Sequence, residues 1–272
     1  MHKKNSSPPR QTTFKYYSKP EIKSKLKEPR ILLFDIETTA ILARVWGLYE
    51  QNAVDVEKDW YMLSFAYKWL DSNVHVIGLP DFPIYKKDPE NDRDLIKKLW
   101  ELFNQADIIV AHNGNAFDIK KSNARFIHHQ LSPPAPYKTI DTLLMARKHF
   151  NFSSNKLDDL GKYLGIGRKV ETGGYSLWRD CLRGDKRAWK KMKEYNSYDV
   201  VLLEQVYLKL MPWSKEVATN TDNCPKCSGD LTRRGYRLTI GYKYQRYQCN
   251  NCGGWSSERL NGQKTIKSLI SL

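Results

Sequence analysis

The amino-acid sequence predicts a mixed α/β domain followed by a small β module that needs metal to fold. Two strand segments joined by a short turn come early, and strands alternating with helices follow, which is the order expected for a mixed sheet. The C-terminal region differs, because it contains two Cys-x-x-Cys pairs and too little apolar sequence for a core of its own. We therefore expect a basic extension at residues 1–30, an α/β domain at 31–212, and a metal-bound module with a basic tail at 213–272.

Five short strands are expected in the α/β domain, each an apolar or β-prone run bounded by turn residues. The first is "ILLF" at 31–34, which leads into "DIETTA". Residues 60–69 and 73–79 are expected to form two strands around the turn "LDSN", and 107–112 forms another strand before the Gly of "HNG". The fifth strand is expected directly after the proline-rich connection "LSPPAPYK".

The helices of this domain are predicted from apolar residues at helical spacing. The clearest helix covers 92–105, and its apolar residues are Leu95, Ile96, Leu99, Trp100, Leu102 and Phe103. Further helices are expected at about 118–130, in "TLLMARKHF", at 156–164 and at about 185–210.

The positive charge of the chain is concentrated in its two ends. The net charge of the 272 residues is +15, of which residues 1–30 carry +7, residues 31–212 carry +2 and residues 213–272 carry +6. Basic ends that flank a nearly neutral domain suit a polyanion, and nucleic acid is the partner that we expect. The alternative is that the basic ends serve only solubility.

No apolar stretch approaches the 18 residues of a membrane span, and no apolar segment follows the basic N-terminal residues as in a secretory signal. We therefore expect no membrane association and a cytoplasmic, reducing location, in which clustered cysteines bind metal rather than form disulfides. Cys181 stands apart from the cluster, and we expect an ordinary half-buried thiol there.

The clustered cysteines are Cys224 with Cys227 and, after twenty-one intervening residues, Cys249 with Cys252. Each pair offers two sulfurs from one tight turn, and two such pairs at this separation fit a tetrahedral, structural Zn²⁺. A segment this small lacks its own core, so zinc must help it fold.

The sequence between the cysteine pairs is expected to form two strands around a Gly turn. Cationic residues alternate there with aromatic ones, and this is the composition of a surface that binds phosphates and stacks on bases. The candidate nucleic-acid contacts are Arg233, Arg237, Tyr244 and Arg246. The stretch also resembles the zinc ribbons attached to some transposases. The alternative is that its tyrosines pack a minimal core and that the ribbon binds a protein.

Acidic residues raise a separate question in the α/β domain. Asp35 and Glu37 lie two apart at the end of an apolar run, so in a strand they point to the same face. Two like charges on one face repel and are costly to desolvate, so solvent, a basic partner or a metal ion must compensate. Asp118 follows the 107–112 strand, and Asp199 lies one helical turn after Tyr195.

Each acidic residue also has an ordinary structural interpretation. Asp35 could end its strand at a turn, Asp118 could cap a helix, and Asp199 could be a solvated helix residue. Asp141, in "TIDT", is best interpreted as the N-cap of the helix that follows it.

The combination of these residues resembles the DEDD superfamily of 3′–5′ exonucleases, which have a ribonuclease H-like fold. Asp-x-Glu-Thr at 35–38 is similar to the first motif, and "HNGNAFD" at 112–118 is similar to the second. Tyr195-x-x-x-Asp199 resembles the third motif in its tyrosine-bearing form, whereas the histidine-bearing subclass would have His in place of Glu194.

The resemblance covers roughly residues 31–212 and extends to the proofreading domains of family B DNA polymerases. It implies a mixed five-stranded sheet flanked by helices, with the zinc ribbon beside it. Since no polymerase domain follows, proofreading within the same chain is not expected.

Two Mg²⁺ or Mn²⁺ ions about 3.5–4 Å apart would activate water, neutralise the phosphate and stabilise the leaving oxygen. We expect Asp35 to bridge both ions, Glu37 and Asp199 to hold the ion that activates water, and Asp118 to hold the other through water. The family implies that Tyr195 orients the attacking water. Without metal, the pKa values of the carboxyl groups should be raised.

Two further residues are predicted to contact the substrate: Thr38, at the terminal nucleotide, and Asn113, in the loop of the second motif. The predicted function is therefore a metal-dependent 3′–5′ exonuclease, with DNA favoured and single-stranded ends expected. Two alternatives stay open: a non-catalytic nucleic-acid-binding protein on a nuclease scaffold, and a structure-specific endonuclease that uses the same metals. The oligomeric state is left open.

Overall fold

The computed structural model describes residues 29–49, 52–169, 172–214, 223–239 and 242–260. Most of the predicted basic extension and the tail after residue 260 lie outside the described residues. The central element is a five-stranded sheet in the order β5-β4-β1-β6-β7. Its strands are β1 (Ile31–Thr38), β4 (Met62–Trp69), β5 (His75–Gly78), β6 (Ile108–Ala111) and β7 (Lys138–Asp141).

The sheet is mixed, as the sequence predicts. Strand β4 pairs antiparallel with both β1 and β5, whereas β1, β6 and β7 run parallel. Because β1 is central and both of its faces are covered, all four residues of its apolar run are buried. Since β1 and β6 are parallel, their carboxyl ends meet at one edge of the sheet, where Asp35 and the chain leading to Asp118 lie.

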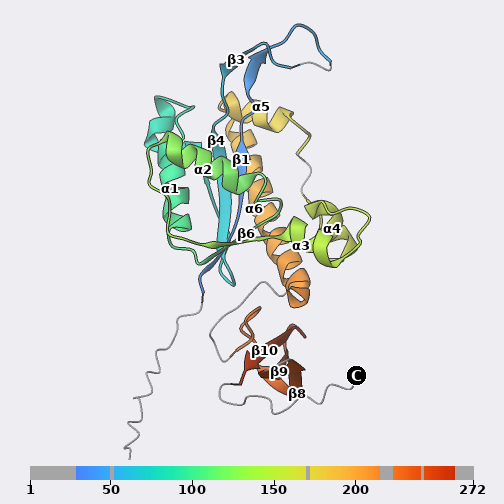
Figure 1. Cartoon of the computed structure of the whole chain (residues 1–272). Helices are drawn as coiled ribbons and strands as arrows, with labels where there is room; N and C mark the ends of the chain where they lie inside the picture. Colours follow the sequence, from blue (N-terminus) through green and yellow to red (C-terminus); the bar gives the residue numbers. More distant parts are fainter. Residues whose placement is uncertain (1–28, 50–51, 170–171, 215–222, 240–241, 261–272) are drawn as a thin grey trace, which may run out of the picture.

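Helices cover both faces of this sheet (Figure 1). They are α1 (Arg93–Phe103), α2 (Asp118–His128), α3 (Thr142–His149), α4 (Leu157–Tyr163), α5 (Ser176–Leu182) and α6 (Lys186–Leu210). One apolar cluster joins the sheet to α1, α2, α5 and the start of α6, and the other joins it to α3, α4 and the rest of α6. All the predicted helices are present within a few residues of their expected ends, whereas α5 was not predicted.

Side-chain caps explain where two of these helices begin. The carboxylate of Asp141 accepts hydrogen bonds from the backbone N–H groups of Leu143 and Leu144, which confirms its prediction as the N-cap of α3. Asp185 accepts in the same way from Arg187 and Ala188 at the start of α6. Helix α6 is thereby fixed at the end nearer to Tyr195.

A hairpin that the sequence does not predict extends from the end of β1. It consists of β2 (Leu42–Arg44) and β3 (Asp55–Lys58), which pair antiparallel above the main sheet in Figure 1. Its apolar side chains are mostly exposed, so the alternation of buried and exposed positions that signals a strand is missing.

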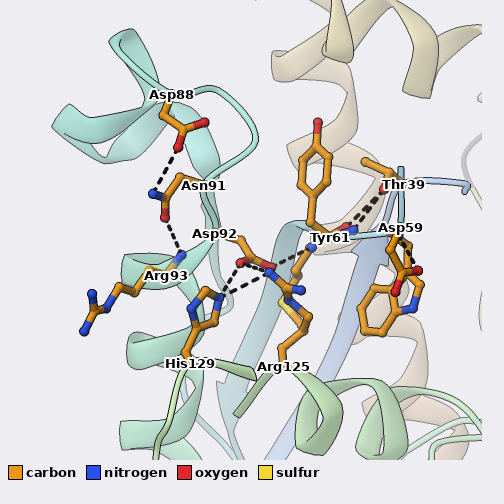
Figure 2. A network of polar contacts seen from close by, with 11 residues as sticks. Thr39, Asp59, Tyr61, Asp88, Asn91, Asp92, Arg93, Arg125 and His129 are labelled. Atoms are coloured by element: carbon orange, nitrogen blue, oxygen red, sulfur yellow. Dashed lines mark hydrogen bonds and ion pairs between the residues drawn. The ribbon is translucent and has the colours of Figure 1, made fainter. Parts of the chain in front are cut away.

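A buried ion network fixes α2 against the sheet (Figure 2). Asp92, which is 0% exposed, accepts hydrogen bonds from the backbone of Met62 and from the guanidinium of Arg125, and it contacts His129 Nε2. Met62 begins β4, Asp92 precedes α1, and Arg125 and His129 come from the C-terminal end of α2 and the residue after it. A buried carboxylate with this many donors ties three elements together and so fixes the helix that begins at Asp118.

The C-terminal region forms a separate three-stranded antiparallel sheet in the order β10-β9-β8. Strands β8 (Leu231–Thr239) and β9 (Tyr242–Cys249) correspond to the two predicted strands, and their expected Gly turn lies outside the described residues. Strand β10 (Trp255–Arg259) was not predicted. Lys226 Nζ donates to the carbonyl of Pro212 at 2.6 Å, so this sheet is anchored just beyond the end of α6.

Among the described residues, no helix is both long enough and apolar enough to cross a lipid bilayer.

Candidate active site and zinc site

Three of the four predicted metal-binding carboxylates converge at the carboxyl end of β1. Asp35 and Glu37 alternate with Ile36 along the strand and therefore share a face, as the sequence predicts. Oxygen atoms of Asp35, Glu37 and Asp199 lie within 4.8 Å of one another. Asp35 lies inside the strand, which continues to Thr38, so the alternative that Asp35 ends its strand at a turn is wrong.

Asp199 enters this cluster from α6. Its residue is 1% exposed, so the interpretation as a solvated helix residue is also wrong. One of its oxygens, Oδ1, is buried and accepts no hydrogen bond from any described residue. A buried carboxylate oxygen without a donor is costly, and a cation bound at this position would remove that cost.

Asp118 approaches the cluster from the start of α2, beyond the end of β6. It is the first residue of α2, and Phe117 occupies the N-cap position without a side-chain cap, so the interpretation of Asp118 as a helix cap is not supported. Instead, Asp118 Oδ1 accepts a hydrogen bond from the backbone N–H of Ile36 at 3.3 Å. It lies outside the group of three oxygens but close enough to Asp35 for their charges to interact.

The four carboxyl groups have raised pKa values, as expected for like charges buried together. Burial, followed by the charges of Asp118 and Glu37, raises the pKa of Asp35 well above its ordinary value. Burial raises the pKa of Glu37 to about 8 and that of Asp118 to about 7. Burial also raises the pKa of Asp199, although a neighbouring lysine opposes the shift.

That lysine is Lys169, which the sequence analysis missed. Its ammonium donates to Asp199 Oδ2 at 2.6 Å and to the hydroxyl of Tyr195 at 3.3 Å. Burial alone lowers the pKa of Lys169, but the charges of Asp199 and Asp35 outweigh burial and raise it. Because Lys169 lies between helices in "GIGRKVETGG", no periodic pattern in the sequence connects it with Asp199.

Two more residues hold the carboxylates in place and were also missed. Asn196, which is 0% exposed, donates from Nδ2 to Asp35 Oδ2 at 2.9 Å and lies 3.3 Å from the hydroxyl of Ser64 in β4. The indole Nε1 of Trp178 donates to Glu37 Oε2 at 3.2 Å. Each of these donors fixes one carboxylate of the β1 pair from a different helix.

Tyr195 lies one turn before Asp199 on α6, as predicted. Its ring packs edge-on against Trp178 with centroids 6.0 Å apart, and its hydroxyl contacts the ammonium of Lys169. Burial, followed by the charge of Asp199, raises the pKa of the Tyr195 phenol, so it stays protonated at neutral pH. The Tyr195 hydroxyl can therefore donate a hydrogen bond to a group bound next to the carboxylates.

Of the two substrate contacts predicted in the α/β domain, Thr38 adjoins the carboxylate pair along β1, whereas Asn113 lies in the loop between β6 and α2. Thr38 is the partly buried last residue of β1, directly after the carboxylate pair. Asn113 is exposed, has a left-handed backbone (φ 63°), and donates its N–H to Asp141 at 2.9 Å. Asp141 also accepts the N–H of Asn115, so the N-cap of α3 orders the loop of the second motif.

A cationic and aromatic group lies next to Asp118. Lys121 Nζ is 3.6 Å from the ring centroid of Trp60 and 5.2 Å from that of Phe117. Phe117 is 40% exposed and directly precedes the Asp118 carboxylate. This part of the surface offers a positive charge and a ring face beside the carboxylates.

The four clustered cysteines form a second candidate metal site. All four sulfurs lie within 4.8 Å of one another, with 3.7 Å between Cys224 and Cys252 and 3.6 Å between Cys227 and Cys249. Tetrahedral zinc with Zn–S bonds of about 2.3 Å requires sulfurs about 3.8 Å apart, so the four residues fit Zn²⁺. Cys181 lies elsewhere, on the buried side of α5, and is 0% exposed, so the expectation of a half-buried thiol is wrong.

The predicted nucleic-acid contacts of the ribbon lie on β8 and β9. Arg237 is directly opposite Tyr244, and Arg233 is opposite Tyr247. An irregularity in the pairing separates these two positions, and it includes Gly235 with its left-handed backbone (φ 74°). Arg233 and Arg237 are consequently not neighbours on one face, as a regular strand would have made them.

The fold is similar to part of a solved polymerase structure. The family B DNA polymerase from the hyperthermophilic archaeon Pyrobaculum calidifontis matches with a TM-score of 0.51 and 18% identity, over 68% of this chain and 25% of the polymerase chain. At this identity the likeness concerns the fold alone.

One curated relative shows similarity in sequence as well. A DNA polymerase III of the PolC type from Ureaplasma parvum is 25% identical over 184 residues, which are 66% of this chain but only 13% of the polymerase. The chain thus matches about an eighth of the length of that relative.

The match to a protein family covers the same part of the chain. Residues 32–211 match RNase_H_2, and this range includes all six helices, the carboxylate cluster and the five-stranded sheet except Ile31. On this match the chain belongs to that family of the RNase_H superfamily.

Proposed function

We propose that this protein is a metal-dependent 3′–5′ exonuclease of the tyrosine-bearing DEDD type. The observation that carries the proposal is the convergence of Asp35, Glu37 and Asp199, with Asp118 beside them, around a buried and unpaired carboxylate oxygen. Tyr195 lies at the same place, one turn from Asp199. The polymerase relatives support a substrate of nucleic acid, with DNA favoured.

The carboxylates fit divalent metal better than they fit any group of the chain itself. Lys169 is the one described cation in contact with Asp199, so three negative charges of the four carboxylates remain uncompensated when all are ionised. Hard oxygen donors at this density suit Mg²⁺ or Mn²⁺. Two such ions, when bound, would activate water and stabilise the leaving oxygen.

The side chains of this chain supply the remaining functions. Asn196 and Trp178 hold the Asp35 and Glu37 carboxylates in fixed orientations before metal binds. The hydroxyl of Tyr195 is available to orient an attacking water, because the phenol is protonated and faces the cluster. Lys169 balances charge at Asp199 in the absence of metal, and its ammonium must shift if a metal ion takes Oδ2.

The substrate end is proposed to enter beside Asp118. Thr38 follows Glu37 in β1, Asn113 lies in the loop that leads to Asp118, and Phe117, whose ring contacts the ammonium of Lys121, directly precedes Asp118. An exposed ring can stack on an unpaired base, and a neighbouring cation can bind its phosphate. We therefore propose single-stranded 3′ ends as the preferred substrate, held by the domain at 31–212.

The C-terminal region is proposed to be a zinc ribbon that aids nucleic-acid binding. In the described part of residues 213–272 only Cys224 and Cys249 among the apolar residues are buried, which supports a structural role for one Zn²⁺.

The test is hydrolysis of end-labelled oligonucleotides. Single- and double-stranded DNA and RNA, labelled at the 5′ or the 3′ end, are incubated with Mg²⁺, Mn²⁺ or no divalent ion. An exonuclease of the proposed polarity releases the 3′ label first as a mononucleotide and leaves a circular single strand intact. Cleavage of the circle would indicate the endonuclease alternative, and metal-independent binding without turnover would indicate the non-catalytic alternative.

A further inference from the structure

The two faces of the ribbon sheet differ in charge, and the strand register defines them. In an antiparallel sheet, paired residues lie on the same face and neighbours along a strand lie on opposite faces. Tyr244 of β9 pairs with Arg237 of β8 on one side and with Arg259 of β10 on the other. These three residues therefore share one face.

The same reasoning extends this face along β9. Tyr242 and Arg246 lie two positions from Tyr244, and Trp255 joins them because it pairs with Gln248. We call this surface the arginine face, and its cationic and aromatic residues are Arg237, Tyr242, Tyr244, Arg246, Trp255 and Arg259. Its remaining described positions are Thr232, Thr239, Gln248 and Ser257, so the register places no carboxylate on it.

Side-chain contacts agree with this assignment. The Arg259 guanidinium lies 3.6 Å from the ring centroid of Tyr242, and the Arg246 guanidinium lies 5.5 Å from that of Trp255. Tyr242 and Trp255 are 43% and 49% exposed. A guanidinium stacked on a ring still presents its N–H groups in the plane, so both phosphate binding and base stacking remain available.

The opposite face has a different composition. It presents Arg233, Tyr236, Lys243, Tyr247 and Glu258, so one carboxylate offsets two cations. That carboxylate is engaged, since the hydroxyl of Tyr247 donates to Glu258 Oε2 at 2.9 Å. Cys249 also belongs to this face, which therefore lies toward the cysteine cluster.

The ribbon is anchored well away from the carboxylates. Asp199 and Leu210 lie eleven positions apart on α6, a distance of about 16 Å at 1.5 Å per residue. Lys226 of the ribbon contacts Pro212, just beyond that end. At about 3.4 Å per nucleotide, a fully stacked strand needs about five nucleotides to cover this distance, and a strand with unstacked bases needs fewer.

We propose that the arginine face binds a single strand of nucleic acid upstream of the end held at Asp35. The three guanidinium groups contact phosphates, and Tyr242 and Trp255 stack on bases. A single strand fits better than a duplex because bases must be unpaired to stack on protein rings. The proposal that this face binds a single strand depends only on the ribbon, whereas the upstream position of the face depends on the proposed exonuclease function.

Binding is tested first, without any need for catalysis. Full-length protein carrying Asp35→Asn is titrated against fluorescein-labelled oligo(dT) of 20 nucleotides, and fluorescence anisotropy gives Kd. Chelators are omitted, because they would also remove zinc. Loss of the Arg259 and Tyr242 pair, by Arg259→Gln with Tyr242→Ala, should weaken binding about fivefold or more, the equivalent of one stacked base at about 1 kcal/mol.

The opposite face offers a matched control. Lys243 lies 3.9 Å from the ring of Tyr236, so Lys243→Gln with Tyr236→Ala removes the same kind of pair and the same charge. Zinc content verifies that the ribbon is folded in both double variants. If the arginine-face double variant loses zinc, the single variant Arg259→Gln replaces it in the titration. Equal loss of affinity in both double variants, or no loss in either, would overturn the proposal.

Substrate length then tests the upstream position. In protein with native Asp35, the arginine-face variant should raise KM for a DNA of 20 nucleotides and leave KM for a trinucleotide unchanged. An effect on both lengths would overturn the upstream position. If no oligonucleotide is hydrolysed, the exonuclease proposal fails while the anisotropy result still decides whether the face binds single strands.

Discussion

The α/β domain and the C-terminal ribbon differ in how much buried core surrounds their candidate metal sites. In the α/β domain, apolar residues of the sheet and of six helices form two large buried clusters, and the carboxylates lie at the edge of that core. In the described part of the ribbon, Cys224 and Cys249 are the only buried residues of the apolar class. We infer that metal is a ligand of a preformed site in the domain and a part of the fold in the ribbon.

This difference explains the polar residues around each site. Asp35 and Glu37 are held by hydrogen bonds from Asn196 and Trp178, while burial raises the pKa values of both carboxyl groups. The sulfurs of the ribbon are held by one another and by backbone N–H groups, such as that of Asn251 to Cys249 Sγ at 3.4 Å. A core can support unfavourable charge, whereas a small sheet without a core cannot.

Removal of zinc should produce the largest effect. Zinc binding to small cysteine sites contributes about 10–16 kcal/mol at neutral pH, so Cys227→Ser should unfold the ribbon while the α/β domain still melts cooperatively. Metal analysis measures the zinc content, and ¹H–¹⁵N spectra show which of the two regions remains folded. Cys181→Ser is the matched control: it should destabilise the domain, where Cys181 is buried, and leave the zinc content unchanged. Loss of the domain's spectrum in Cys227→Ser would contradict the distinction between the two regions.

Asp35→Asn should have the largest effect on catalysis. It removes a central charge and little volume, so turnover should fall about a thousandfold or more, the equivalent of about 4 kcal/mol, while the melting temperature stays the same or rises. Single-turnover hydrolysis and thermal melting are the measurements. Asp107→Asn is the matched control, because Asp107 is exposed and precedes β6 at the opposite edge of the sheet. Wild-type turnover in Asp35→Asn would refute the active-site assignment.

Tyr195→Phe should have a smaller effect on the same reaction. If the hydroxyl orients water, kcat should fall about tenfold to a hundredfold with little change in KM or metal affinity. Tyr207→Phe is the control on the same helix, since the buried Tyr207 hydroxyl has no hydrogen-bond partner among the described residues. Weaker metal binding with an unchanged rate would show that Tyr195 has another role.

The stability of the protein without divalent metal should depend on pH in a defined direction. The folded-state pKa values of Glu37 and Asp118, about 8 and about 7, lie above their ordinary values of 4.5 and 3.8. At a pH between the ordinary and the folded-state pKa values, the folded protein keeps protons that the unfolded chain has lost. The free energy of unfolding therefore falls as the pH rises from about 4 to 8. A loss of 1 kcal/mol would lower the melting temperature by about 2–4 °C.

Divalent metal should reverse this trend. Mg²⁺ or Mn²⁺ should raise the melting temperature at pH 8 more than at pH 5, because only ionised carboxylates bind it. Glu37→Gln should flatten the pH profile, whereas Glu194→Gln, at an exposed position of α6, should not. An identical profile in the Glu37 variant would mean that this carboxylate does not carry the effect. The assay is differential scanning fluorimetry across the pH series.

The sequence by itself determined the five strands of the main sheet, all helices of the domain except α5, and both sets of candidate metal-binding residues. Strand alternation placed Asp35 and Glu37 on one face, helical spacing placed Tyr195 beside Asp199, and the Cys-x-x-Cys spacing predicted the sulfur cluster. These are local relations, and the period of a strand or helix is a property of the backbone alone. The hairpin of β2 and β3 escaped prediction because its apolar residues are exposed and show no alternation.

Only the tertiary structure decided which groups surround the carboxylates and which face of the ribbon carries its cations. Lys169 reaches Asp199 across thirty residues of chain, and Trp178 reaches Glu37 across 141, at distances that no sequence period encodes. In the ribbon, Arg233 and Arg237 would share a face in a regular strand. One extra residue at the irregularity that includes Gly235 turns Arg233 to the opposite face, because strand alternation reverses whenever the register shifts by one.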